Sequence, residues 1–333
     1  MKAIVLKNYK TDPILDSNFS DPGLPNSDEV VVRMKAGSIN PIDWKTMQGK
    51  VKMLIDYPLP IVLGNDGSGV IHELGSSVKD FKVGDEVYFR IGKPKVGTFA
   101  EKVIVKSTDV SLKPENISFE EAAGIPLAGL TAYQALFERA GITKGQKVFI
   151  AAGSGGVGSL AIQMAKIAGA YVASTCGTSN VELVKSLGAD LVIDYRKENF
   201  EELLKDYDIT FDTLGGGDTF KCFRILKKGG VNVSISNIPT PDTAAKYGKN
   251  FLIRGLFGLL NHKIFSSAKK FGIHYEYLFM NSSGSQLGLL KKYIEEGTLK
   301  PLVDTVYEMS EFRKAFDHQM TGRSKGKIVI RIS

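Results

Sequence analysis

The first 126 residues alternate short apolar runs with turns rich in Gly and Pro. In residues 29–34 apolar side chains stand at alternating positions, and comparable runs occupy 69–74, 85–91 and 100–105. A period of two is typical of strands that bury one face. The pattern therefore predicts an antiparallel or barrel-like β unit in this part of the chain.

Beyond Pro126 the pattern changes to strands that alternate with helices. A helix is expected over 128–140, and the apolar run 147–151 shows no alternation, which suits a strand buried on both faces. Further strands are expected at 171–175, 191–194, 209–214 and 231–235, and helices at 159–168, 181–187, 200–204 and 220–226. This alternation predicts an α/β fold with a doubly wound parallel sheet.

The last part of the chain is less regular. Residues 239–275 mix apolar and basic side chains, with helical periodicity only in places. A helix is expected at 287–295, and strands at 305–309 and 327–332. We expect the last strand to return to the first β unit.

Length sets the number of domains. A chain of 333 residues suggests two domains of roughly 150 residues each. We predict one domain from residues 1–126 together with 301–333, and a second domain, residues 127–300, inserted into it.

Composition narrows the classes of protein that fit. The chain has only two Cys, Cys176 and Cys222, and four unpaired His, which excludes a disulfide scaffold and a zinc finger. The net charge of +7, taken as spread along the chain, favours a solvated basic surface and an anionic cofactor over nucleic-acid binding. No secretory or membrane-spanning segment is apparent, so we expect a cytoplasmic protein without a membrane partner.

The strongest local motif is Gly153-x-Gly155-x-x-Gly158, between the run 147–151 and an Ala-rich helix. In this context we expect Gly153 to allow the tight turn, Gly155 to admit a pyrophosphate, and Gly158 to let the helix pack closely on the sheet. The backbone N–H groups expected to face the phosphates are those of Ser154, Gly156 and Val157. The alternative is an ordinary turn between strand and helix.

The end of the second strand of the predicted parallel sheet discriminates between cofactors. The strand 171–175 is followed by Cys176, Gly177, Thr178, Ser179 and Asn180, without an acid. An acid at this place binds the ribose 2′-hydroxyl of NAD and would repel a 2′-phosphate. The segment therefore favours NADPH, unless its residues simply form a turn.

A larger set of motifs occurs in one order along the chain. It comprises Asn40-Pro41-Ile42-Asp43, Gly64-Asn65-Asp66-Gly67, Leu127-Ala128-Gly129-Leu130-Thr131, the glycine-rich turn, Phe211-Asp212-Thr213-Leu214-Gly215 and Gly326-Lys327. With these motifs the chain resembles the medium-chain dehydrogenase/reductase superfamily, and most of all its zinc-independent quinone oxidoreductase and alkenal/enone reductase branch. The resemblance covers nearly the whole chain and weakens over 239–275.

The resemblance implies a fold and a cofactor. The fold would be a Rossmann doubly wound parallel sheet inserted into a GroES-like β-barrel domain, with the active-site cleft between the two. The cofactor would be NADPH and the assembly a homodimer. Zinc-dependent members carry a Cys near Asn40 and a His-Glu pair near Asn65 and Asp66, and this chain lacks these ligands, so we expect no metal.

The same resemblance implies site residues. Asn40 and Asp43 would border the nicotinamide, and Lys45 would donate to the substrate carbonyl, or would be a surface lysine. The residues expected to bind the cofactor, besides the glycine-rich turn, are Thr131, Thr178, Ser179, Tyr195, Leu214, Ser234, Ser236, Phe279, Met280, Asn281 and Lys327. For Lys327 the alternative is an outward charge on a strand. A phosphate-binding Lys common in the family would fall at Asn180.

These implications predict a reductase of quinones or of the activated C=C bond of enones and alkenals. Such small electrophiles need no Lewis acid, because their own conjugation activates them. Two alternatives are an alcohol dehydrogenase and a non-catalytic NADPH-binding protein with a redox-sensing or RNA-associated role. The apolar residues within 251–271 would form a cap on the cleft, a dimer interface or plain core.

Overall fold

The computed structural model describes all residues, Met1–Ser333, and divides them into two compact units. The first unit comprises Met1–Leu130 and Asn281–Ser333, and the second comprises Thr131–Met280. The fold is α/β, as predicted. The second boundary lies at residue 280 rather than at the predicted residue 300.

The second unit is built on six parallel strands in the order β11-β10-β9-β12-β13-β14. The strands are β9 (Lys147–Ile150), β10 (Tyr171–Cys176), β11 (Leu191–Asp194), β12 (Tyr207–Asp212), β13 (Leu226–Ser234) and β14 (His274–Tyr277). This order, in which the chain winds outward from β9 in both directions, confirms the predicted doubly wound sheet. Strand β14 was not predicted from the sequence.

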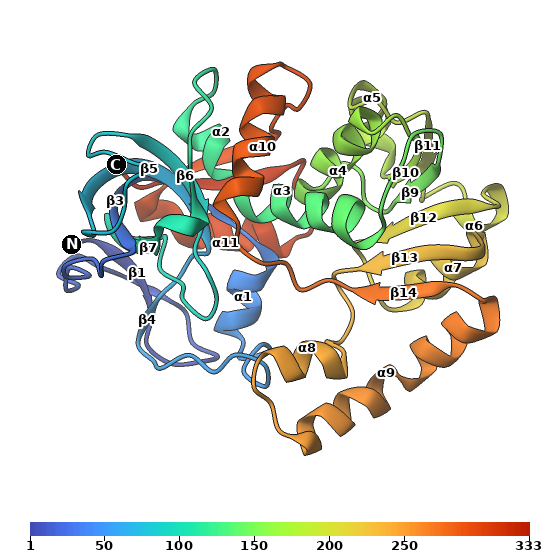
Figure 1. The fold of residues 1–333 in the computed structure, drawn as a ribbon, viewed down its shortest axis with the longest axis horizontal. Helices are drawn as coiled ribbons and strands as arrows, with labels where there is room; N and C mark the ends of the chain where they lie inside the picture. The colour runs from blue at the N-terminus through green and yellow to red at the C-terminus, as the bar shows by residue number, and fades with distance from the viewer. The chain divides into compact units, whose positions relative to one another are not determined.

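Helices cover both faces of this sheet (Figure 1). On one face lie α4 and α5, and on the other face lie α6, α7 and α9, where α6 and α7 pack on Phe149 and Ile193 of the sheet. The helical elements of the unit are η2 (Gln134–Arg139, a π-helix continuing from α3), α4 (Gly156–Ile167), η3 (Thr178–Asn180), α5 (Val181–Ser186), α6 (Phe200–Leu203), α7 (Gly217–Ile225), α8 (Pro241–Lys246) and α9 (Phe251–Phe271).

The first unit contains two sheets and no closed barrel. A seven-stranded sheet runs in the order β15-β16-β3-β5-β6-β8, with β7 paired to β3, and a three-stranded sheet has the order β2-β1-β4. The strands are β1 (Ala3–Leu6), β2 (Ile14–Asp16), β3 (Glu29–Ile39), β4 (Ile61–Val62), β5 (Asp66–Leu74), β6 (Glu86–Arg90), β7 (Lys102–Lys106), β8 (Val110–Leu112), β15 (Val303–Glu308) and β16 (Lys327–Arg331). The predicted barrel does not close, since β15 and β8 form opposite edges and α10 packs beside β8.

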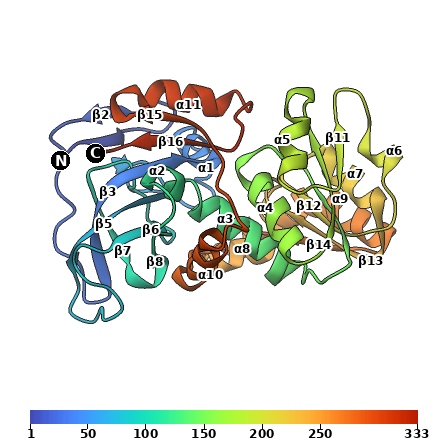
Figure 2. The same ribbon diagram turned by 90° about the horizontal axis from the view of Figure 1, so that it is seen from above.

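The last strand returns to the first unit, as predicted. Strand β16 pairs antiparallel with β3, with Ile328 opposite Ile39, and α11 packs along β16 and β15 (Figure 2). Ile39, Ile328 and Ile330 are buried together with Phe99 and Phe316. The helical elements of this unit are α1 (Pro41–Met47), η1 (Ser107–Asp109), α2 (Phe119–Ala123), α3 (Pro126–Tyr133, which ends in the second unit), α10 (Gly284–Glu295), η4 (Met309–Glu311) and α11 (Phe312–Met320).

Helix α10 explains the shifted boundary. It packs against β8 and η1, and the buried hydroxyl of Tyr88 on β6 donates a hydrogen bond of 2.6 Å to the carbonyl of Leu287. The prediction placed this helix in the inserted domain because an amphipathic pattern does not identify the partner of its apolar face.

The irregular region 239–275 contains two helices, α8 and α9, that the sequence only partly indicated. Helix α9 is 21 residues long and is capped at both ends. The Asn250 side chain accepts from the Ile253 N–H, and Gly272 adopts a left-handed conformation with φ 66°. No helix of the protein combines the length and the hydropathy that crossing a bilayer requires.

We predict that Tyr88→Phe lowers the free energy of unfolding by about 0.5–1.5 kcal/mol, because it removes the buried hydrogen bond to the Leu287 carbonyl. Urea denaturation followed by circular dichroism measures the effect. Tyr171→Phe, at an exposed tyrosine on β10, is the matched control and should change stability little. Equal stability of Tyr88→Phe and the control would contradict this role of the bond.

Candidate functional site

The glycine-rich turn connects β9 to α4 at the carboxyl edge of the parallel sheet. Ala152, not Gly153, adopts the left-handed backbone, with φ 54°. Gly153 is required for space instead, because a Cβ there would lie 2.2 Å from Oγ of Ser174. A Cβ at Gly158 would lie 2.3 Å from the Ala152 carbonyl oxygen. Gly158 therefore allows close packing at the helix start, as expected. The turn conformation expected at Gly153 is adopted by Ala152 instead.

Helix α4 begins at Gly156, directly after this turn, with Gly155 as its N-cap residue. The first backbone N–H groups of a helix lack acceptors within it, and they carry the positive end of the helix dipole. The Ser154 hydroxyl accepts a hydrogen bond of 3.1 Å from the Asn180 amide, which links this turn to the loop after β10. The edge thus offers donors of the kind that bind a pyrophosphate.

The loops after β10 and β11 lie beside each other. The Thr178 hydroxyl donates 2.6 Å to the Asp194 carboxylate, and this bond is the first cause that lowers the pKa of Asp194. The Tyr195 hydroxyl and Nε of Arg196 come within 3.5 and 3.6 Å of the Cβ position of Gly177. Arg196 therefore brings a cation to the place where the sequence suggested only hydroxyl and amide donors.

Arg196 was missed from the sequence. The signal that could have found it is its position two residues after β11, at the same edge of the sheet as Thr178 and Ser179. Ser179 itself is exposed, and its hydroxyl bonds to the Asn180 side chain at 3.4 Å.

The loop after β12 is organised by Asp212, which was not predicted as a site residue. Its carboxylate accepts from the backbone N–H groups of Leu214 and Gly215 and from the hydroxyls of Thr219 and Ser234. Ser234, predicted as a cofactor residue, is fully buried, and its side chain supports this loop. The Ser236 hydroxyl likewise donates to the Thr213 carbonyl at 2.6 Å, whereas the Leu214 side chain is exposed.

The remaining predicted cofactor residues are dispersed. Thr131 is buried on α3, and Phe279 packs edge-on against Tyr247 at 5.3 Å between ring centroids. Met280 is buried at the end of the second unit, and Asn281 begins the returning segment of the first unit.

A buried network of polar and charged groups surrounds the start of α1 in the first unit. Nζ of Lys327 donates 2.5 Å to the Asn40 side-chain oxygen and 3.1 Å to the Ile39 carbonyl. The Asn40 amide in turn donates 2.9 Å to Asp66, which also accepts from the Ser38 hydroxyl at 2.8 Å. Lys327 therefore points inward, and the alternative of an outward charge is wrong.

Asp43 connects the start of α1 to Asn65 and, through Asn65, to Arg90. Its carboxylate accepts 2.7 Å bonds from the Asn40 backbone N–H and from the Asn65 amide. The Asn65 oxygen accepts from the Arg90 guanidinium at 3.2 Å. Asn40, Asp43 and Lys327, all predicted as site residues, thus lie together in this network.

Burial is the largest cause of the pKa shifts of these groups. It raises the pKa of Asp43 to about 7, against the opposing bonds from Asn40 and Asn65. Burial also raises the pKa of Asp66, and it lowers the pKa of Lys327, although both carboxylates favour the charged ammonium. Two carboxyls and one ammonium thus share one desolvated site.

Lys45 lies further along α1 and is half-buried. Its ammonium lies 5.8 Å from the centroid of the Trp44 ring, and that of Lys50 lies 5.1 Å from the same ring. Burial lowers the pKa of Lys45, and repulsion by Lys50 lowers it further. Lys45 forms no ion pair, so it is a partly desolvated cation held beside an aromatic ring.

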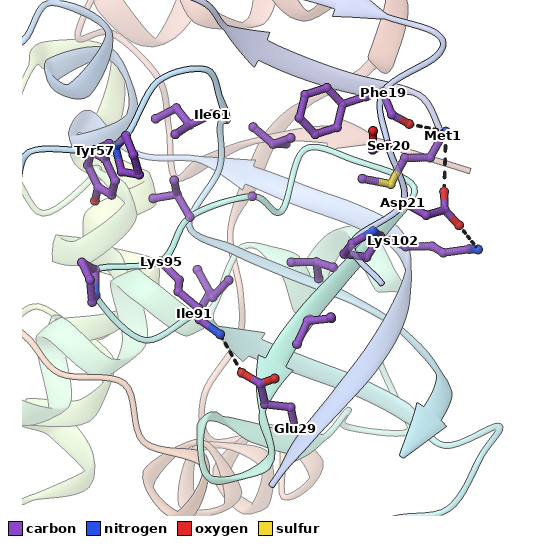
Figure 3. Close-up of a pocket in the computed structure, with 18 of the residues that line it drawn as sticks. Met1, Phe19, Ser20, Asp21, Glu29, Tyr57, Ile61, Ile91, Lys95 and Lys102 are labelled. Carbon is purple, nitrogen blue, oxygen red and sulfur yellow. Dashed lines mark hydrogen bonds and ion pairs between the residues drawn. The ribbon is translucent and has the colours of Figure 1, made fainter. Parts of the chain in front are cut away.

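A separate hollow of about 670 Å³ lies in the first unit (Figure 3). Its wall includes Phe19, Ile61 and Ile91, and two ion pairs flank it, Lys95–Glu29 at 2.6 Å and Lys102–Asp21 at 2.5 Å. None of the predicted catalytic or cofactor residues lines this hollow.

Two family models match the chain. The "Alcohol dehydrogenase GroES-like domain" matches residues 26–115, and "Zinc-binding dehydrogenase" matches residues 187–330. The chain is 38% identical over 342 residues to a 2-methylene-furan-3-one reductase of Solanum lycopersicum, covering 99% of this chain and 79% of the relative. The identity and both coverages are the same for an NADPH-dependent alkenal/one oxidoreductase, chloroplastic, of Arabidopsis thaliana.

A solved structure supports the same grouping. The quinone oxidoreductase from Coxiella burnetii has a TM-score of 0.86 and 31% identity, covering 100% of this chain and 99% of that one.

The residues do not fit the zinc that one of these model descriptions names. Catalytic zinc needs three protein ligands of the His, Cys or carboxylate type. No group of three or more His, Cys, Asp or Glu side chains is placed to hold a metal ion. Near the start of α1 only carboxylates qualify, and the oxygens of Asp66 already accept from Ser38, Asn40 and the Leu127 N–H.

We predict that Asp43→Asn weakens the pH dependence of stability. Because burial raises its pKa, Asp43 contributes most to stability below the pKa of about 3.9 that it has unfolded. This contribution is lost as the pH rises to about 7, at up to roughly 1.4 kcal/mol per pH unit. The variant lacks this loss, so its stability relative to wild type should improve from pH 4 to pH 8.

Urea denaturation across that pH range measures the difference. Asp80→Asn, at an exposed aspartate, should follow the wild-type profile. Parallel profiles for wild type and Asp43→Asn would show that Asp43 is not held protonated by burial.

Proposed function

Because the chain belongs to the medium-chain dehydrogenase/reductase superfamily, in its quinone oxidoreductase branch, we propose that it reduces quinones or the conjugated C=C bond of enones and alkenals with NADPH. The proposal is supported by the 38% identity to two relatives named as reductases of such substrates, one of them NADPH-dependent. The residues at the carboxyl edge of the parallel sheet and the position of Lys45 support it further.

The carboxyl edge of the parallel sheet fits NADPH. The N–H groups at the start of α4 would hold the pyrophosphate, where the glycine-rich turn admits no Cβ at Gly153 or Gly158. The 2′-phosphate would lie by Gly177, against the Arg196 guanidinium and the Tyr195 hydroxyl. Asp194 is nearby, but the Thr178 hydroxyl, the Arg196 N–H and the Lys197 ammonium already bind its carboxylate.

The unpaired charge of Lys45 is the main support for the catalytic part of the proposal. A half-buried ammonium without an acidic partner attracts negative charge, and in this reaction negative charge develops on a carbonyl oxygen. Bound NADPH would supply a hydride, which would form the new C–H bond at the β-carbon. The π electrons move to the oxygen, which Lys45 stabilises, and water supplies the proton that completes the product. A quinone accepts the same hydride and proton and gives a hydroquinone.

The network at the start of α1 positions Lys45 in this scheme. Asn40 and Asp43 are bonded within the network and do not need to touch the substrate to matter. They fix the helix start from which Lys45 projects one turn later.

We predict that Lys45→Met lowers kcat/KM for enones and quinones about 10- to 100-fold, because one oxyanion donor is lost. Oxidation of NADPH followed by absorbance measures it. The matched control is Lys50→Gln, which removes the other cation beside Trp44. It should keep the activity and extend it to higher pH, since the repulsion that lowers the pKa of Lys45 is removed.

Unchanged kinetics of Lys45→Met at every pH would remove Lys45 from the mechanism. Failure of all quinones, enones and alkenals to consume NADPH in the presence of the wild-type protein would refute the proposed activity itself.

We predict that Arg196→Gln raises the KM for NADPH about tenfold or more and leaves the KM for NADH unchanged, because only NADPH carries the 2′-phosphate. Steady-state titration of both cofactors measures this. Lys197→Gln, at the neighbouring exposed lysine, should discriminate less. An equal rise for both cofactors would instead indicate a structural role of Arg196.

A further inference from the structure

Helix α9 exposes an apolar stripe on the side away from the core of the second unit. Leu252, Leu256 and Leu259 recur at helical spacing and are 66%, 42% and 74% exposed, and Leu260 beside them is 47% exposed. We call these four leucines the α9 outer face. Residues on the opposite side of the helix, including Phe257, Asn261 and Ala268, are buried. In Figure 1 the helix runs along the lower edge of the unit, below α7 and β14.

The positive charge of the protein is concentrated in the segment that contains this face. Residues 243–275 contain six cations and no acid, against a net charge of +7 for the whole chain. The expectation that the charge is spread along the chain is therefore wrong. The six are Lys246, Lys249, Arg254, Lys263, Lys269 and Lys270.

None of these six cations forms an ion pair, whereas lysines elsewhere in the unit do, such as Lys166 with Asp190 and Lys227 with Asp208. Lys263 lies over the ring of Phe220, which leaves its charge uncompensated. The α9 outer face is thus an apolar strip in a segment whose positive charge is uncompensated.

We propose that the α9 outer face docks on an anionic lipid surface. A helix with exposed Leu on one side and Lys or Arg around it lies in the interface of a bilayer, with its apolar side among the acyl chains. Cations near such a surface add attraction to anionic headgroups. The four leucines would enter the surface, and Lys269 and Lys270 would remain among the headgroups. This inference differs from our expectation that the protein has no membrane partner.

Charge complementarity distinguishes this occupant from others. A symmetric contact with a second copy would bring the same uncompensated cations together, which is unfavourable. A nucleic acid would use the cations, but it would gain nothing from four exposed leucines on a helix. An anionic lipid surface uses both features.

Vesicle flotation with the full chain tests the proposal. We expect the protein to float with vesicles of phosphatidylcholine that contain a third phosphatidylserine, and not with vesicles of phosphatidylcholine alone. High salt should weaken the binding, because it screens the attraction to the headgroups.

Two sets of substitutions separate the apolar and the electrostatic contributions. The variant Leu252→Gln, Leu256→Gln, Leu259→Gln should lower the partition coefficient at least about tenfold for each leucine. The variant Lys249→Gln, Arg254→Gln, Lys270→Gln should lower it by about fivefold for each cation at low salt. The matched controls are Leu24→Gln, Leu203→Gln, Leu289→Gln and Lys7→Gln, Lys144→Gln, Lys205→Gln, at exposed residues outside α9. Circular dichroism and melting temperatures of all variants establish that they fold.

Several results would overturn the proposal. One is the absence of flotation with anionic vesicles, and another is equal loss of binding in the controls and the α9 variants. A third is a wild-type dimer in sedimentation that becomes monomeric in the leucine variant while no vesicle is bound, which would make the face an interface between copies. A fourth is oligonucleotide binding that the cation variant alone abolishes, without vesicle binding by the wild type.

Discussion

The burial of charge is the constraint on which the first unit depends. A lysine inside a protein is costly unless oxygen atoms replace its water. Lys327 finds such oxygens on Asn40 and Ile39, 287 positions or more away along the chain, and the carboxyls of Asp43 and Asp66 favour its charged form. The pairing of β16 with β3 brings these groups together, so the last strand, the end of β3 and the start of α1 depend on one another.

The same constraint determines what α1 presents. Asp43 accepts from the Asn40 backbone and from Asn65, so the first turn of the helix is bonded on both sides. Lys45 follows in the next turn, half-buried and without an acidic partner. A rigid helix start therefore carries a cation whose charge is not neutralised, which is the arrangement that stabilises a developing oxyanion. No group of three or more His, Cys, Asp or Glu side chains is placed around it to hold a metal ion.

The sequence predicted what local pattern determines. Strand β9 was recognisable because both of its faces are apolar, and Gly158 because a helix must pack closely at that turn. The partners of polar side chains were not predictable. The pattern of a strand does not identify the hydrogen-bond partners of its polar side chains. Ser234 donates to Asp212 and Lys327 donates to Asn40, and neither pair was predicted. Helix α9 was missed as one element, although the sequence carries its capping residues, Asn250 and Gly272, at the two ends.

The distribution of charge shows why a net value describes a protein poorly. Charges that are farther apart than a Debye length, about 10 Å, act separately, whereas several cations on one helix and the turn before it add their fields. The leucines among them do not serve the core, because Phe257, Asn261 and Ala268 on the other side of α9 already pack against the unit. Neither packing nor helix propensity requires Leu252 or Leu259 at exposed positions, where a charged side chain would keep the helix equally well. The fold of the second unit therefore accounts for the position of α9 but not for the residues on its outer side.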